Sequence, residues 1–101
     1  MQVNIKATMK ETVAFVEGSI NSANAAEFGK ALAVLPGEAE SVTLDIEGLD
    51  YISSAGLRVL LNMQKKFNAK NGKMVIRNAN GMIMEVFEAT GFLDIFTVEN
   101  D

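Results

Sequence analysis

The stretch from Ser41 to Lys70 constrains the fold of this chain more than any other. Val42, Leu44 and Ile46 alternate with polar residues, which is the period of a half-buried β-strand. After Ser54, a second pattern has the spacing of one helical face, made of Leu57, Leu60, Leu61, Gln64 and Phe67. A strand with helical patterns on both sides is predicted to be central and to pair in parallel with a neighbour.

The N-terminal third predicts a hairpin and a helix. Val3–Ala7 and Thr12–Glu17 are two apolar runs joined by a short polar segment, which is typical of two antiparallel strands. Asn21 or Ser22 is the expected N-cap of the helix that follows, because both side chains accept hydrogen bonds from helical N–H groups. Pro36-Gly37 is expected to end this helix.

The C-terminal third continues the alternation of strand and helix. Lys73–Arg77 is predicted to be a strand, and Asn80 is predicted to cap a short helix over Met82–Ala89. Gly91 is expected to close this helix. The last apolar segment, Phe92–Val98, is expected to be half turn and half strand.

The order of these elements predicts an α/β fold. A chain of 101 residues supports one hydrophobic core, so we expect a single domain over residues 1–101. Its sheet is predicted to be mixed, with four to five strands and about three to four helices packed on it. In such open sheets the loops at the carboxyl ends of the strands are the usual functional edge, and Ser53–Gly56 leaves its strand there.

The composition argues against several classes of function. The formal net charge of −4 does not suit nucleic-acid binding, which needs a basic surface. Without cysteine or histidine the chain has no Ser-His triad, no thiol chemistry and no Cys- or His-ligated metal. Neither a secretory signal pattern nor a run of about 18 apolar residues is present. We therefore expect a cytoplasmic protein with no cofactor and no metal, which binds neither membranes nor nucleic acid.

The serines at the start of the long helix are the candidate functional residues. Ser53 and Ser54 lie where free backbone N–H groups and the positive end of the helix dipole favour an anionic group. Taken alone, both serines also fit a purely structural role as N-caps. Gly56 either leaves backbone uncovered in the first turn or relieves crowding between helix and sheet, and the sequence does not separate these two roles.

Two further sets of charged residues are candidates for function. Asp45 and Glu47 lie on one face of their strand, and since nothing else in the sequence converges on them we interpret them as solvated residues. The long helix also has a basic side in an otherwise acidic chain, formed by Arg58, Lys65, Lys66 and Lys70. That side is either simply solvated or steers an acidic partner.

Three segments together resemble the STAS domain family, which comprises the anti-sigma factor antagonists and their relatives. The run from Val42 to Leu57 is similar to the central motif of that family, in which an apolar strand leads through small hydroxyl residues and Gly-Leu into a helix. Gly18-Ser19-Ile20-Asn21 is similar to the family's Gly-x-Leu/Ile-Asp turn before its first helix. Ala89–Phe96 is similar to its terminal Gly-Leu-x-x-x-Phe segment.

The resemblance implies a protein-binding switch that is not itself an enzyme. An antagonist of this type binds an anti-sigma factor that is also a serine kinase, and so releases a sigma factor. Phosphorylation of one serine ends the binding, and a serine phosphatase restores it. On the motif that serine is Ser54, while Ser53 stands where many members have Asp and Ala55 where many have a second Ser or Thr. The implied docking rim comprises Asn21, Ser53, Ser54, Ala55, Gly56 and Arg58.

Two other functions remain open from the sequence. A STAS-like scaffold, or a subunit of a transport or sensory complex, would dock a partner through the same loop without phosphorylation of Ser54. A small-molecule or nucleotide binder would use the same strand edge, although the sequence shows no convergent polar groups for a pocket. For the isolated chain we expect a monomer or a weak dimer.

Overall fold

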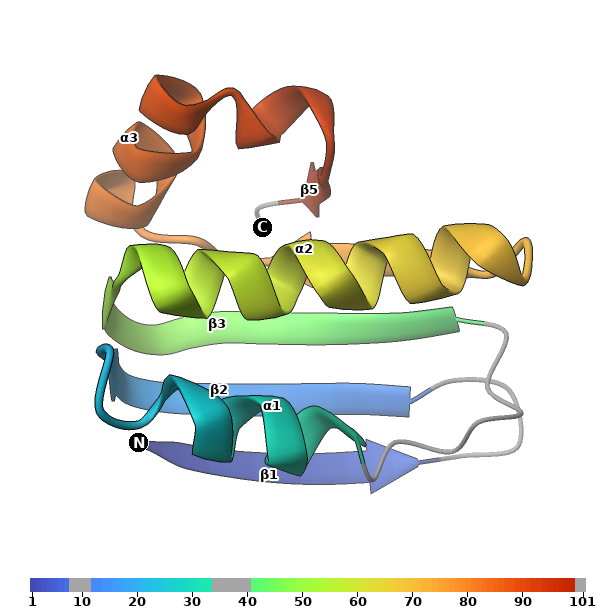
Figure 1. The fold of residues 1–101 in the computed structure, drawn as a ribbon, viewed down its shortest axis with the longest axis horizontal. Helices are drawn as coiled ribbons and strands as arrows, with labels where there is room; N and C mark the ends of the chain where they lie inside the picture. Colours follow the sequence, from blue (N-terminus) through green and yellow to red (C-terminus); the bar gives the residue numbers. More distant parts are fainter. Residues whose placement is uncertain (8–11, 34–40, 100–101) are drawn as a thin grey trace.

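A computed structural model describes residues 1–7, 12–33 and 41–99, in which the strands form one sheet in the order β1-β2-β3-β4-β5 (Figure 1). The strands are β1 (Gln2–Ala7), β2 (Thr12–Ile20), β3 (Ser41–Ile52), β4 (Lys73–Arg77) and β5 (Thr97–Glu99). β1 pairs with β2 in antiparallel orientation, and all the other neighbouring strands are parallel. The predicted hairpin and the predicted central parallel strand are thus confirmed.

Three α-helices and one 3-10 helix complete the described part of the fold: α1 (Ala25–Ala33), α2 (Ser54–Ala69), α3 (Gly81–Thr90) and η1 (Phe92–Asp94). In Figure 1, α1 and α2 lie in front of the sheet, α3 lies above the start of α2, and the chain after α3 returns to β5. The mixed α/β fold predicted from the sequence is confirmed. The predicted helix end at Pro36-Gly37 falls outside the described residues. No helix in the described ranges is long and apolar enough to cross a membrane.

The hydrophobic core lies between the sheet and its helices. The first half of β3 places Val42, Leu44 and Ile46 in it, and Met74 and Ile76 of β4 lie beside them, as alternation requires. From the helices, Phe28 and Leu32 of α1 and Leu57, Leu60 and Phe67 of α2 meet this layer. Each such side chain contributes about 1.5–3 kcal/mol to folding through the apolar surface it removes from water. The core therefore holds α2 against the sheet, where it runs alongside β3 (Figure 1).

β3 is longer than its alternating pattern indicated. Alternation predicts a strand that ends near Glu47, whereas β3 continues to Ile52. The register between β2 and β3 shifts twice along this length, once between Phe15 and Glu17 and again between Gly18 and Ser19. Such irregularities interrupt the period-two pattern, which is why the sequence alone does not show the extension. The extension carries β3 to the end of β2.

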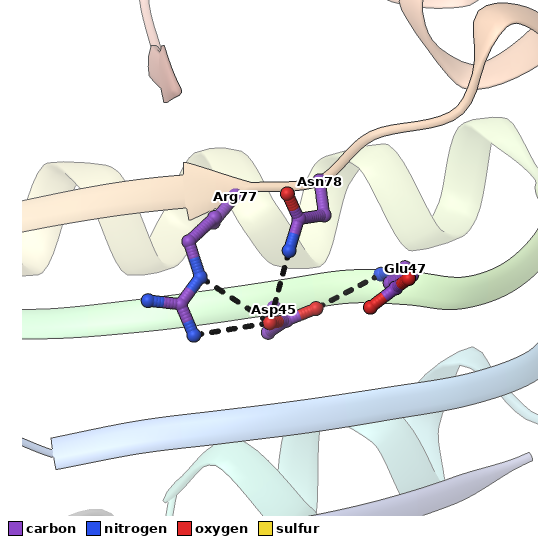
Figure 2. A network of polar contacts seen from close by, with 4 residues as sticks. All are labelled: Asp45, Glu47, Arg77 and Asn78. Atoms are coloured by element: carbon purple, nitrogen blue, oxygen red, sulfur yellow. Dashed lines mark hydrogen bonds and ion pairs between the residues drawn. The ribbon is translucent and has the colours of Figure 1, made fainter. Parts of the chain in front are cut away.

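The interpretation of Asp45 as a solvated residue is wrong. Its side chain is only 8% exposed, and its Oδ2 accepts hydrogen bonds from Arg77 Nε at 3.2 Å and Nη2 at 3.0 Å. Asn78 Nδ2 also donates to Oδ2 at 3.3 Å, and the backbone N–H of Glu47 donates to Oδ1 at 3.1 Å (Figure 2). Glu47 itself is exposed, as expected. Asp45 thus joins β3 to the end of β4.

The same corner fixes the start of α3. Asn78 has a positive φ of 63°, and its backbone N–H donates to the carbonyl of Glu99 in β5 at 3.0 Å. Two residues later, Asn80 Oδ1 accepts from the N–H of Ile83 at 2.8 Å, which confirms Asn80 as the N-cap of α3. Asn80 Nδ2 also donates to the carbonyl of Leu49 at 2.9 Å. These contacts hold the connection after β4 against both neighbouring strands.

Replacing Asp45 by Ala is expected to lower the free energy of unfolding by about 1–3 kcal/mol, because Arg77 and Asn78 then lose a shared acceptor. The side chain of Arg77 is 32% exposed, so water compensates part of the loss. Urea unfolding measures the change, with Glu47→Ala as the matched control on the same strand. A loss no larger than that of the control would show that the Asp45 contacts add no stability.

Candidate functional site

The carboxyl ends of β2 and β3 meet at one edge of the sheet. Ile20 and Ile52 are paired in register, and the backbone N–H of Ser53 donates to the carbonyl of Ile20 at 2.8 Å. Asn21 and Ser53, the residues that leave these two strands, are therefore brought together. The prediction that Ser53–Gly56 leaves its strand at the carboxyl edge of the sheet is confirmed, since β3 ends at Ile52 and α2 begins directly after Ser53.

Asn21 organises the turn that leads into α1. Its Oδ1 accepts from the N–H groups of Ala23 at 2.9 Å and Asn24 at 3.0 Å, while Asn24 Oδ1 accepts from the N–H of Asn21 at 2.8 Å. Asn24 Nδ2 donates to the carbonyl of Ser19 at 2.9 Å, which ties the turn to β2. Of the two predicted caps, Asn21 makes the capping contacts, and the helix then begins at Ala25. Asn21 remains exposed at the rim.

Ser53 is the N-cap of α2. Its backbone is extended, its Oγ accepts from the N–H of Gly56 at 3.2 Å, and its carbonyl accepts from the N–H of Leu57 at 2.9 Å. The first N–H groups of a helix lack partners within the helix. Here those of Ser53 and Gly56 are satisfied, whereas no described residue accepts from Ser54 or Ala55. The first turn also contains no acidic side chain, so its positive end is not neutralised from within.

Gly56 is buried, so the expectation that it leaves backbone uncovered is wrong. A Cβ at this position would lie 2.7 Å from Ile20 Cγ2 and 2.8 Å from Ile52 Cγ1, closer than real Cβ atoms approach their neighbours. Relief of crowding between helix and sheet is therefore its role in the fold. The backbone N–H groups without a described acceptor belong instead to Ser54 and Ala55, at the solvent side of the turn.

The remaining predicted rim residues lie on the accessible side of the first two turns of α2. Ser54 is exposed, Ala55 is half-buried, and Arg58 is exposed one turn after Ser54. These three residues, with Asn21 and Ser53, lie at the carboxyl ends of β2 and β3 and the start of α2, and we call the five together the docking edge. The partner-binding role predicted for the docking edge and Gly56 stays a prediction; the residues are Asn21, Ser53, Ser54, Ala55, Gly56 and Arg58.

Tyr51 is a candidate that the sequence analysis missed. Its side chain is 50% exposed, and it pairs with Ser19 of β2 two residues before Ser53. Exposed aromatic side chains are well suited to anchor protein contacts. The sequence signal that could have identified Tyr51 is that the sole tyrosine of the chain stands directly before the serine motif. Its exposure could not be read from the sequence, because the register shifts in β3 decide which side chains face outward.

The docking edge carries a small set of polar groups. It offers hydroxyl groups, an amide and a guanidinium, with no histidine or cysteine in the chain to act as base or nucleophile. Among the described residues, no group of acidic side chains is arranged to hold a metal ion. Ser54 is the exposed nucleophilic oxygen at the start of the helix.

Replacing Ser53 and replacing Ser54 are expected to change the free energy of unfolding by different amounts. Ser53→Ala removes the cap acceptor of Gly56 and should lower the free energy of unfolding by about 1 kcal/mol. Ser54→Ala, at an exposed position, should change it by less than about 0.5 kcal/mol. Denaturant unfolding of both variants beside the wild type measures this difference. Equal losses would contradict the assignment of Ser53 as the cap.

Gly29 in α1 and Gly56 in α2 provide a matched pair for the crowding at Gly56. Gly56→Ala should cost about 1–3 kcal/mol, since the new methyl group meets Ile20 and Ile52. Gly29→Ala in α1 should instead add about 0.5–1 kcal/mol, because a Cβ there meets only the Val59 methyl groups at 3.8 Å. Thermal unfolding would report opposite shifts in Tm, and shifts of the same sign and size would contradict the close packing at Gly56.

Comparison with known proteins identifies the family to which the chain belongs. A family model described as the STAS domain matches residues 2–101 of the chain. One relative is BtrV of Bordetella bronchiseptica, which is named as an anti-sigma factor antagonist. Its sequence is 44% identical to this chain over 89 residues, and the match covers 87% of this chain and 77% of BtrV. The anti-sigma-B factor antagonist of Listeria monocytogenes is 28% identical over 87 residues, covering 85% of this chain and 76% of its own length.

A solved structure shares the fold. SpoIIAA of Bacillus, a cell fate determinant, is known in its phosphorylated form, and that structure superposes with a TM-score of 0.72. The match covers 96% of this chain and 90% of SpoIIAA at 16% sequence identity. At this identity the likeness shows the arrangement of sheet and helices, and no more.

Proposed function

This chain belongs to the STAS domain family, and from that premise we propose that it is an anti-sigma factor antagonist switched off by phosphorylation of Ser54. The names of BtrV and of the Listeria protein support the antagonist role. The existence of a phosphorylated form of SpoIIAA supports control by phosphate in a protein of this fold. The observation that carries the proposal for this chain is the exposed hydroxyl of Ser54 at the start of α2.

The proposed partner is an anti-sigma factor that is also a serine kinase, and it binds the docking edge. The polar and charged side chains available there are those of Asn21, Ser54 and Arg58, all of which are exposed. Binding the partner there competes with its hold on a sigma factor, which is how an antagonist acts. In this scheme the chain is the substrate of the kinase, and a serine phosphatase returns it to the binding form. The chain itself catalyses nothing.

Charge explains how the phosphate would end binding. A phosphoserine carries about −1.5 to −2 charges at neutral pH. At Ser54 it would enter the contact surface, where an unpaired charge removed from water costs roughly 3–5 kcal/mol. A loss of about 4 kcal/mol is close to a thousandfold in affinity.

The same modification should leave the fold intact. The cap of α2 is Ser53, so a phosphate on Ser54 does not disturb the hydrogen bonds that start the helix. The N–H groups of Ser54 and Ala55 have no described acceptor, and the helix dipole favours a negative charge beside them. The switch therefore acts on the surface and not on the core.

The test is intact mass after incubation with ATP and the candidate anti-sigma kinases of the host. We expect the wild type and Ser53→Ala to gain one phosphoryl group and Ser54→Ala to gain none. If Ser54→Ala also gains a phosphoryl group, the modified residue is not Ser54 and the proposal is wrong.

Binding of the same kinases to Ser54→Asp separates the switch from a constitutive scaffold. The carboxylate should weaken the wild-type affinity about a thousandfold if charge at this position ends binding. Ser54→Asn, of similar size and without charge, is the matched control and should retain most of the affinity. Equal, tight binding of both variants would favour a scaffold whose contact does not depend on phosphate.

A further inference from the structure

Arg58 is placed to reach a phosphate on Ser54. Both residues are exposed on α2, and they are separated by four positions, which puts them on the same side of the helix one turn apart. Helical side chains lean toward the N-terminus, so a long side chain at position 58 covers the turn that contains position 54. An acidic group that precedes a basic one at this spacing is the more favourable order.

The guanidinium of Arg58 has no competing partner in the described part of the chain. No carboxylate within residues 1–7, 12–33 and 41–99 forms an ion pair with it; the ion pair found there joins Arg77 to Asp45. Asp50, the exposed acidic residue before the serine motif, makes no such contact with Arg58. Arg58 is therefore available to a new anion on its own helix.

We propose that Arg58 binds the phosphate of phosphorylated Ser54, so that modification also withdraws the exposed cation from the docking edge. This inference rests on the proposed phosphorylation of Ser54. A guanidinium presents parallel N–H donors that match two oxygens of a phosphate, which an ammonium group cannot do. The next basic residue of α2 is Lys65, which lies seven positions after Arg58, about 10 Å along the helix axis. Lys65 is therefore too far from Ser54 to bind its phosphate in place of Arg58.

Phosphorylation would then change the docking edge in two ways at once. In the unmodified chain Arg58 offers a positive charge to an acidic group of the partner. In the modified chain the same guanidinium faces the phosphate, so the partner meets an added negative charge and loses the positive one. The switch is therefore larger than the charge of the phosphate alone would make it.

The test uses phosphoserine incorporated at position 54 during translation, so it does not depend on any kinase. Phosphorus NMR follows the second ionisation of the phosphate against pH in the phosphorylated wild type, Arg58→Gln and Lys65→Gln. A nearby cation favours the doubly charged phosphate and lowers its pKa. We therefore expect the pKa of the phosphate to be higher in Arg58→Gln, and that of Lys65→Gln to stay with the wild type.

Two results would overturn the inference. One is a phosphate pKa that does not rise in Arg58→Gln, and the other is an equal rise in Lys65→Gln, which would indicate only the general field of the helix. As a second readout, the Nε–H resonance of Arg58 should move when the wild type carries the phosphate. If the host kinases fail to modify Ser54 but these shifts appear, the proposed function fails while the Arg58 contact stands.

Discussion

The close approach of the first turn of α2 to the ends of β2 and β3 is the constraint on which the docking edge depends. Gly56 permits it, since any larger residue would meet Ile20 and Ile52. The hydrogen bond from Ser53 to Ile20 joins the two strand ends at the same place. With the helix held this near the sheet, Asn21, Ser54 and the adjacent turn form one surface although they come from separate parts of the chain.

Adjacent serines divide the structural and the chemical tasks between them. Ser53 turns its hydroxyl inward to the N–H of Gly56, and Ser54 leaves its hydroxyl in solvent. Because the helix start does not use the second hydroxyl, that group can be modified without an immediate cost to the helix. This separation makes the N-cap interpretation and the switch interpretation compatible, although from the sequence alone they compete for the same two residues.

The sequence predicts those parts of the fold that follow a regular period. Alternation in the strands, the apolar face of α2 and the cap at Asn80 all have local signals, and each is confirmed. The partners of Asp45 have no local signal, since Arg77 and Asn78 are more than thirty residues away in sequence. The burial of Gly56 and the exposure of Tyr51 depend on the shifted register of β3, which only the pairing of whole strands decides. Of the site, the serine motif was predictable, and the shape of the surface around it was not.

The order of strands in the sheet is also their order in the chain. Each strand after β1 therefore pairs with the strand that precedes it in the chain, and no strand is inserted between two that have already paired. Pairing between strands that are neighbours in the chain keeps their separation in sequence smaller than another strand order would, which limits the entropy lost on loop closure. During synthesis the docking edge, built from β2, β3 and the start of α2, can form before β4, α3 and β5 have left the ribosome. The C-terminal elements are then added to an existing scaffold.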